Sequence, residues 1–238
     1  MHKTITSLIF ALASALLAAS CDDGPVDETA AYSQEGHSVR LTATLSGLHT
    51  WDGSLYVALA AFNDESDYAI TSRRISGTDG TVDVTLSGVT EEATRVELCV
   101  LNNLRQRVAT FATLEGDALL SGEETTLFDA GTRSVSMLSA VQTSVFNTTC
   151  TGCHGGNGGA AAGLFLTDGR SHEALVGKPS KKVADGTLVK AGDAEGSVLY
   201  QTLTTSLSKG WHYDHTAEVI DQRRRSLIQA WIDGGAEE

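Results

Sequence analysis

Residues 150–154 have the sequence Cys-Thr-Gly-Cys-His, and this stretch decides the fold and the chemistry expected of the 238-residue chain. On one helical turn, Cys150 and Cys153 lie on the same side. Both thiols can then form thioethers to the two vinyl groups of one haem, and His154 can bind the iron through its imidazole. The sequence therefore predicts one covalently bound haem c, held by Cys150, Cys153 and His154.

Two other interpretations of this stretch stay open. A zinc half-site needs about four ligands in total, and the remaining histidines have no matching cysteine partner in the sequence. A local disulfide between Cys150 and Cys153 is the second alternative. Of the other cysteines, Cys99 lies in an apolar, strand-like run, where a buried and inert thiol is expected.

The N-terminus resembles a bacterial lipoprotein signal. Lys3 supplies a positive charge, residues 5–19 are apolar, and residues 17–21 are Leu-Ala-Ala-Ser-Cys. The apolar stretch is short for a membrane span. The resemblance implies cleavage before Cys21, lipidation of Cys21 and a lipid anchor in the membrane. An ordinary secretory signal, with Cys21 merely next to the cleavage site, is the alternative.

These features predict where the chain is located and what it does not bind. We expect a signal peptide over residues 1–20 and an acidic, flexible tether over residues 21–36. The predicted location is the cell envelope, on the periplasmic or outer-surface side of a bacterial membrane. The net charge of −13, from 17 Lys and Arg against 30 Asp and Glu, excludes the usual electrostatic basis for nucleic-acid binding.

Residues 37–130 alternate apolar and polar side chains in short runs separated by Gly, Asn, Asp and Ser. Period-two alternation is typical of antiparallel strands that bury one face. About seven strands at this spacing favour an all-β, immunoglobulin-like sandwich. Four strands are marked by Val39, Leu41, Ala43 and Leu45; by Leu55, Val57, Leu59 and Ala61; by Val82, Val84 and Leu86; and by Val96, Leu98 and Val100, and three more are expected at 68–75, 107–114 and 125–128.

After residue 136 the apolar spacing becomes helical. Ser136 is a suitable N-cap for a first helix, and Thr216 for a last helix over 217–233. Shorter helices are expected near 171–176 and 196–203. We expect the first and last helices to pack against each other through their apolar faces, which are formed by Met137, Leu138, Val141, Val145 and Phe146 and by Ile220, Leu227, Ile228 and Trp231.

This part of the chain, residues 137–235, resembles monohaem class I cytochrome c modules of exported bacterial proteins, which are abundant in planctomycete-type sequences. The resemblance implies an all-α cytochrome c-like domain after the sandwich, and a redox partner protein in the cell envelope. The matching segments occur in the order of the family: 141–146, the Cys-Thr-Gly-Cys-His stretch, Leu-Val-Gly-Lys-Pro-Ser at 175–180, Val-Lys-Ala-Gly-Asp at 189–193, Ser-Val-Leu-Tyr at 197–200, and Leu-Ile-Gln-Ala-Trp-Ile-Asp-Gly-Gly at 227–235.

The chain departs from this family at the sixth iron ligand. The family usually places a Met-Pro pair before the last helix, whereas this chain has no Met after Met137 and has Gly-Trp-His-Tyr-Asp-His at 210–215. We predict His212 as the second axial ligand, because its distance from Trp231 best matches that of the missing Met, with His215 as the alternative. We also expect the second ring nitrogen of His154 to donate to a backbone carbonyl or similar acceptor, which fixes the tautomer that binds iron.

The leading functional hypothesis is a lipid-anchored c-type cytochrome that transfers single electrons, with His/His axial ligation. Under this hypothesis, the protein is an electron carrier rather than a catalyst. The first alternative is a haem enzyme, or a gas or redox sensor, with an open distal site. The second is a surface interaction protein that uses the β-sandwich for recognition.

Overall fold

The computed structural model describes residues 36–51, 53–116, 119, 125–156 and 159–238. The predicted signal peptide, the lipidation site Cys21 and all of the predicted tether except Gly36 lie outside these residues. The described residues all belong to one of the two compact units into which the contacts divide the chain, the unit that ends at Glu238.

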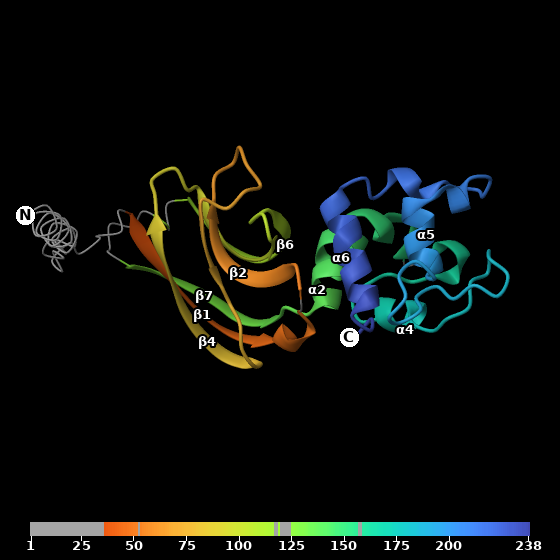
Figure 1. Ribbon diagram of the computed structural model, residues 1–238, viewed down its shortest axis with the longest axis horizontal. Coiled ribbons are helices and arrows are strands. Elements are labelled where there is room, and N and C mark those ends of the chain that lie inside the picture. The colour runs from red at the N-terminus through yellow and green to blue at the C-terminus, as the bar shows by residue number, and fades with distance from the viewer. Residues whose placement is uncertain (1–35, 52, 117–118, 120–124, 157–158) are drawn as a thin grey trace, which may run out of the picture. The chain divides into compact units, whose positions relative to one another are not determined.

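Seven strands in the described residues form two sheets (Figure 1). In the first sheet β1 pairs antiparallel with β4 and parallel with β7, and all pairs of the second sheet are antiparallel. The first sheet has the order β4 (Gly80–Val89), β1 (His37–Ser46), β7 (Thr125–Ser134), and the second has the order β3 (Thr71–Arg74), β2 (Leu55–Phe62), β5 (Arg95–Asn102), β6 (Arg107–Glu115).

The predicted alternation of buried and exposed side chains holds in β1. Val39 and Leu41 are fully buried, whereas Arg40 between them is exposed. Strands β2 and β5 are different, because both of their faces are covered. In β2, the six consecutive residues from Val57 to Phe62 are all buried. Cys99 on β5 is 0% exposed, and burial raises the pKa of its thiol well above the usual range. The prediction of a buried, inert thiol is therefore confirmed.

A continuous helical segment follows the strands. It consists of α2 (Met137–Val141), a nine-residue π-helical segment η3 (Gln142–Cys150) and α3 (Thr151–His154), and the residues at both junctions keep right-handed helical dihedral angles. Ser136 begins it as predicted, since its hydroxyl oxygen accepts a hydrogen bond from Ser139 N at 3.1 Å. The Cys-Thr-Gly-Cys-His stretch thus lies at the C-terminal end of an unbroken helical segment.

The later helices are α4 (Ser171–Leu175), α5 (Val198–Thr204) and α6 (Gln222–Asp233). Helix α6 begins later than predicted, because Asp221 rather than Thr216 caps it through a bond from Arg223 N at 2.9 Å. Ile220 consequently lies before the helix and is 75% exposed, not part of the buried face. The predicted contact between the first and last helices is confirmed, since the rings of Phe146 and Trp231 pack edge to face with centroids 6.5 Å apart.

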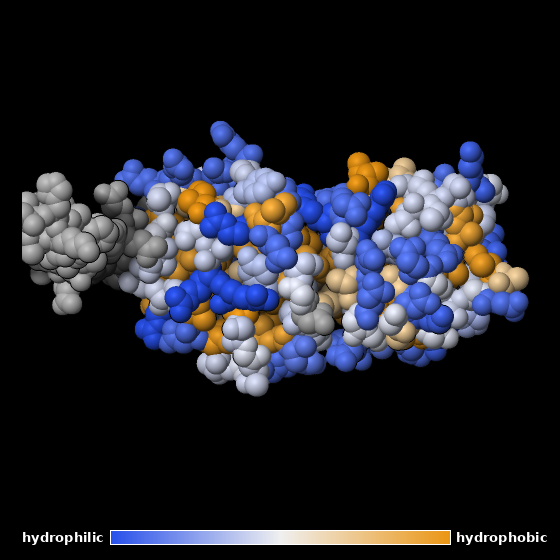
Figure 2. All heavy atoms as spheres, in the orientation of Figure 1, coloured by the Kyte–Doolittle hydropathy of each residue, from blue (hydrophilic) through white to orange (hydrophobic). Residues whose placement is uncertain are grey.

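Polar residues dominate the visible surface of the described part, and apolar side chains form only small separate areas on it (Figure 2). Large apolar side chains that are at least half exposed include Tyr213 and Ile220, which lie close together in sequence, and Leu127 on β7. Single exposed apolar side chains are normal on soluble domains. They give no reason to assign a large apolar interface to this face.

The predicted fold class is wrong. We expected an antiparallel, immunoglobulin-like sandwich and a separate all-α cytochrome c-like domain, but the described residues are mainly β with few helices, and β1 and β7 run parallel. Between residues 155 and 221 the helices are short, and isolated bridges such as Val176–Val189 connect irregular segments. The apolar core around the helices also includes Val100 and Val108 from the second sheet. The helices therefore do not form an all-α domain of their own.

A chain of ion pairs also joins the second sheet to α6. The Glu97 side chain is 3% exposed; its carboxylate pairs with Arg107 and accepts from Thr110 Oγ1 at 2.7 Å. Arg107 pairs with Asp67 at 2.7 Å, and Asp67 pairs with Arg223 at 2.8 Å. Burial alone favours a higher pKa for Asp67, but the hydrogen bonds from Arg223 and Arg107 outweigh it and lower the pKa. Ion pairs and apolar contacts together hold α6 against the second sheet.

Replacing Arg223 by Met, which keeps most of the aliphatic stem, is expected to lower the free energy of unfolding by about 1–2 kcal/mol. The side chain is 25% exposed, and its loss leaves Asp67 and the Arg107 carbonyl oxygen each with one hydrogen bond fewer and Asp221 with two fewer. Urea unfolding measures the change. Arg224→Met is the matched control, because Arg224 has no ion pair within the described residues. Equal losses of unfolding free energy in the two variants contradict a specific stabilising role for the ion pairs of Arg223.

Candidate haem-attachment site

The Cys-Thr-Gly-Cys-His stretch forms the last helical turn of the segment that begins at Met137. Cys150 is half-buried, Cys153 is exposed, and neither forms a disulfide. Burial, followed by the nearby Glu218 and Cys153, raises the pKa of Cys150 to about 11. Its sulfur is therefore protonated at neutral pH.

His154 is oriented by the segment that follows it. Its Nδ1 lies 3.2 Å from the carbonyl oxygen of Leu164, and its own carbonyl oxygen accepts a hydrogen bond from Leu166 N at 2.8 Å. Because a carbonyl oxygen can only accept, this contact assigns the proton to Nδ1 and leaves Nε2 free to bind a metal. The predicted contact of a ring nitrogen of His154 with a backbone carbonyl is confirmed.

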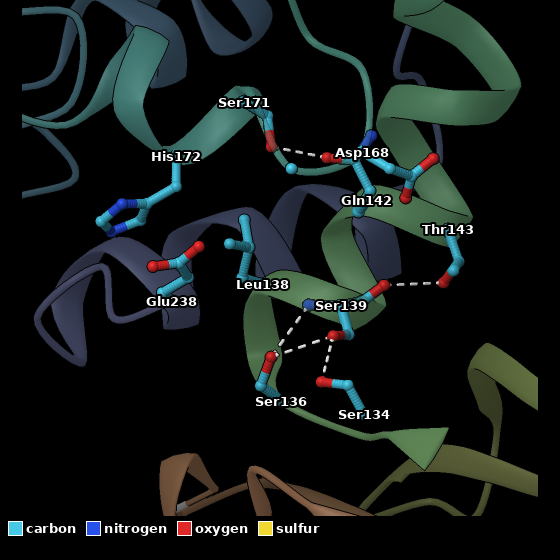
Figure 3. Close-up of a pocket in the computed structure, with 11 residues that line it drawn as sticks. Ser134, Ser136, Leu138, Ser139, Gln142, Thr143, Asp168, Ser171, His172 and Glu238 are labelled. Carbon is cyan, nitrogen blue, oxygen red and sulfur yellow. Dashed lines mark hydrogen bonds between the residues drawn. The ribbon is translucent and has the colours of Figure 1, made fainter. Parts of the chain in front are cut away.

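Gln142 holds the segment that orients His154. It is buried, and its side-chain nitrogen donates to the Leu166 carbonyl oxygen at 2.8 Å and to Asn147 Oδ1 at 2.7 Å. Its side-chain oxygen accepts from Ser171 Oγ at 2.6 Å (Figure 3). A buried amide with three partners fixes its neighbours strongly. The sequence gives Gln142 no chemical role, since only its pairing across the fold shows what it does.

His215 lies opposite His154. The centroids of the two imidazole rings are 6.3 Å apart and their planes are inclined by 30°. Two imidazoles on opposite sides of one metal ion have centroids about 6 Å apart, since each metal–nitrogen bond is about 2 Å long and each nitrogen lies about 1 Å from its ring centre. The spacing of the two ring centroids therefore matches that of an axial pair of ligands, while the small angle between their planes describes a stacked pair of rings.

Three further observations describe the surroundings of His215. Its Nδ1 is buried and has no hydrogen-bond partner among the described residues. Burial, followed by the charge of His154, lowers the pKa of His215 and keeps its ring neutral, the form that binds metals. Tyr213 and Trp211 pack edge-on against it with centroid distances of 5.2 and 6.3 Å, and the Tyr213 hydroxyl donates to the Glu218 carboxylate.

The structure does not bring His212 to the site. His212 is exposed, and no ring contact between it and His154 occurs in the described part of the chain. The position that we preferred from its distance to Trp231 is therefore not the one that faces His154. That distance was taken from the family spacing between the missing Met and Trp231, and a spacing along the sequence does not fix the path of the loop. A 3-10 turn at His215–Ala217 (η6) and an extended Asp221 precede α6. The alternative, His215, is the histidine that the fold places there.

Other candidate sites lie elsewhere. Two cavities of about 330 Å³ each are lined by residues that do not include the attachment stretch. One lies beside α2 and includes Ser139, Gln142 and His172 (Figure 3), and the other contains the Arg107–Asp67–Arg223 ion pairs. Among the described residues, no cluster of three or more His, Cys, Asp or Glu could hold a metal ion. Haem iron needs no such cluster, because the macrocycle supplies most of its ligands.

No family model, no curated protein and no solved structure matches the chain. Within the part that the structure describes, no helix is both long enough and apolar enough to cross a membrane.

Proposed function

We propose that this protein binds one haem c covalently and transfers single electrons. The observation that carries the proposal is the stacked pair of imidazoles of His154 and His215, whose ring centroids lie 6.3 Å apart and one of which belongs to the Cys-Thr-Gly-Cys-His turn. A buried, unpartnered Nδ1 on His215 is an independent sign that this side chain meets a group that the polypeptide does not supply. The residues present therefore fit a haem.

Each residue has a distinct role in this proposal. Cys150 and Cys153 would hold the haem through thioethers, and His154 and His215 would supply ligands to its iron. When bound, the haem supplies an iron that alternates between the ferrous and ferric states. The Leu164 carbonyl orients His154, while Tyr213 and Trp211 pack edge-on against His215. Imidazole in place of a thioether gives a lower potential than that of His/Met centres.

The placement of His215 favours an electron carrier over an enzyme or a sensor. With both His154 and His215 as ligands, the iron would have no open position for a substrate or a gas. Electron transfer needs no open position, because no bond to iron forms or breaks. We propose a redox partner protein in the cell envelope.

We further propose that Cys21 anchors the protein to a membrane of the cell envelope through lipid. The support is the sequence pattern of residues 1–21 alone. Incorporation of labelled palmitate into the parent protein, but not into Cys21→Ser, tests this anchor. Equal labelling of both proteins excludes Cys21 as the acceptor.

Purification from a host with an intact cytochrome maturation system tests haem binding. The expected product is coloured, has the mass of the mature polypeptide plus one haem, and keeps the haem through acid–acetone extraction. Its visible spectrum is expected to be six-coordinate and low-spin in both oxidation states. A colourless product at the bare polypeptide mass, without iron, overturns the proposal.

A further inference from the structure

The loop between α5 and α6 carries His215 and has little regular structure to hold it. It contains two 3-10 turns, Ser206–Ser208 (η5) and His215–Ala217 (η6), with an irregular stretch between them. Such a loop has many conformations, and ordering it costs entropy. Specific side-chain contacts must therefore select the conformation in which His215 faces His154.

Ser208 makes the central contact in this loop. It is 0% exposed, although its neighbours Lys209 and Gly210 are exposed. Its hydroxyl oxygen accepts the backbone N–H of His215 at 3.0 Å, and the hydroxyl donates to Asp214 Oδ1 at 3.1 Å. This buried hydroxyl is thus hydrogen-bonded both to His215, which lies beside His154, and to Asp214, which precedes His215 in the sequence.

Asp214 extends the contact to the following turn. The same oxygen, Oδ1, also accepts from Thr216 N at 3.0 Å and from Thr216 Oγ1 at 2.9 Å. The backbone on both sides of His215 is therefore fixed by side chains that do not touch the imidazole ring. Ser206, two residues before Ser208, is exposed and forms no side-chain hydrogen bond within the described residues.

We propose that Ser208 and Asp214 are positioning residues that hold His215 on the iron and set how often this axial position opens. The inference rests on the proposed haem function and adds the residues that control its second ligand. Without the Ser208 hydroxyl, the backbone N–H of His215 loses its acceptor in a buried place. The loop conformations that withdraw His215 then become more populated, by about tenfold for one lost hydrogen bond of this kind.

Carbon monoxide binding to the ferrous protein measures this opening. At saturating carbon monoxide, the rate in a six-coordinate protein is limited by the departure of His215. Ser208→Ala is expected to raise this rate about tenfold, with the covalent haem retained. Ser206→Ala is the matched control and is expected to leave the rate unchanged. A rate for Ser208→Ala within twofold of the parent overturns the inference.

A double variant separates positioning from general damage to the fold. If Ser208 acts only through His215, Ser208→Ala has no effect on the rate in the His215→Ala background. The same tenfold increase in that background overturns the inference while leaving covalent haem binding intact. A parent protein without haem, in contrast, overturns both the inference and the proposed function.

Asp214 provides a second test at an exposed position, where folding is less at risk than at Ser208. Asp214→Asn keeps an oxygen in place of Oδ1 and is expected to open at nearly the parent rate. Asp214→Ala removes the acceptor of three hydrogen bonds and is expected to open about tenfold faster. Equal rates for the two variants contradict positioning by this oxygen.

Discussion

His215→Ala is expected to convert the ferric haem from six-coordinate, low-spin to mostly five-coordinate, high-spin iron, while the covalent attachment remains. His215 is the only described histidine whose ring faces His154, so its removal leaves the second axial position to water or added ligands. The thioethers depend on Cys150 and Cys153 and are unaffected. Visible and electron paramagnetic resonance spectra of the purified protein measure the change of spin state.

Two companion variants make this result specific. His212→Ala is the matched control, because His212 lies in the same loop, is exposed and is expected to leave the spectrum unchanged. His215→Met is expected to restore a low-spin spectrum at a higher midpoint potential, since a thioether stabilises ferric iron less than an imidazole does. If the spectrum changes in His212→Ala but not in His215→Ala, the second ligand is His212 and not His215.

Much of the local structure can be predicted from the sequence. The alternating positions 39–45, 55–61, 82–86 and 96–100 all lie within strands, and Ser136 caps the first helix as its residue type suggests. These patterns succeed because they report which side chains the backbone must bury or bond locally. The helical stripe that includes Phe146 likewise predicts its contact with Trp231.

The fold class could not be obtained in the same way. Alternation in β1 shows which face is buried but not whether β7 runs parallel or antiparallel beside it. Val100 and Val108 alternate like other strand residues, yet they join the core around the helices. Short motifs resembled a family with an all-α domain, but they do not reveal that the sheet supplies part of this core.

The site shows the same division between local and long-range information. Cys150, Cys153 and His154 are adjacent in sequence, so one helical turn is enough to predict their arrangement. The preference for His212 rested on its distance in sequence from Trp231, which does not determine the path of the loop before α6, a helix that begins at 222 and not at the predicted 217. Ser208 carried no sequence signal, because a serine in a polar loop is ordinary until its burial is known.

Replacing both Cys150 and Cys153 by Ser is expected to abolish covalent haem attachment completely. Serine cannot form a thioether to a vinyl group, and the two cysteines are the only ones on the turn that bears His154. Each single variant keeps one thiol and is expected to give a reduced yield of attached haem. Protein mass and haem staining after denaturation measure attachment directly, because non-covalent haem is lost under these conditions.

Cys99→Ala is the control for the loss of a thiol. Cys99 is fully buried on β5, outside the attachment turn, so this variant is expected to keep its covalent haem. The two other interpretations of the Cys-Thr-Gly-Cys-His stretch give different results in the same measurement. A parent protein that binds one zinc ion without haem supports a metal half-site, and a colourless parent with a disulfide between Cys150 and Cys153 supports the local disulfide. Covalent haem that persists in the double serine variant contradicts attachment at this turn, because no other thiol of the described residues lies beside His154.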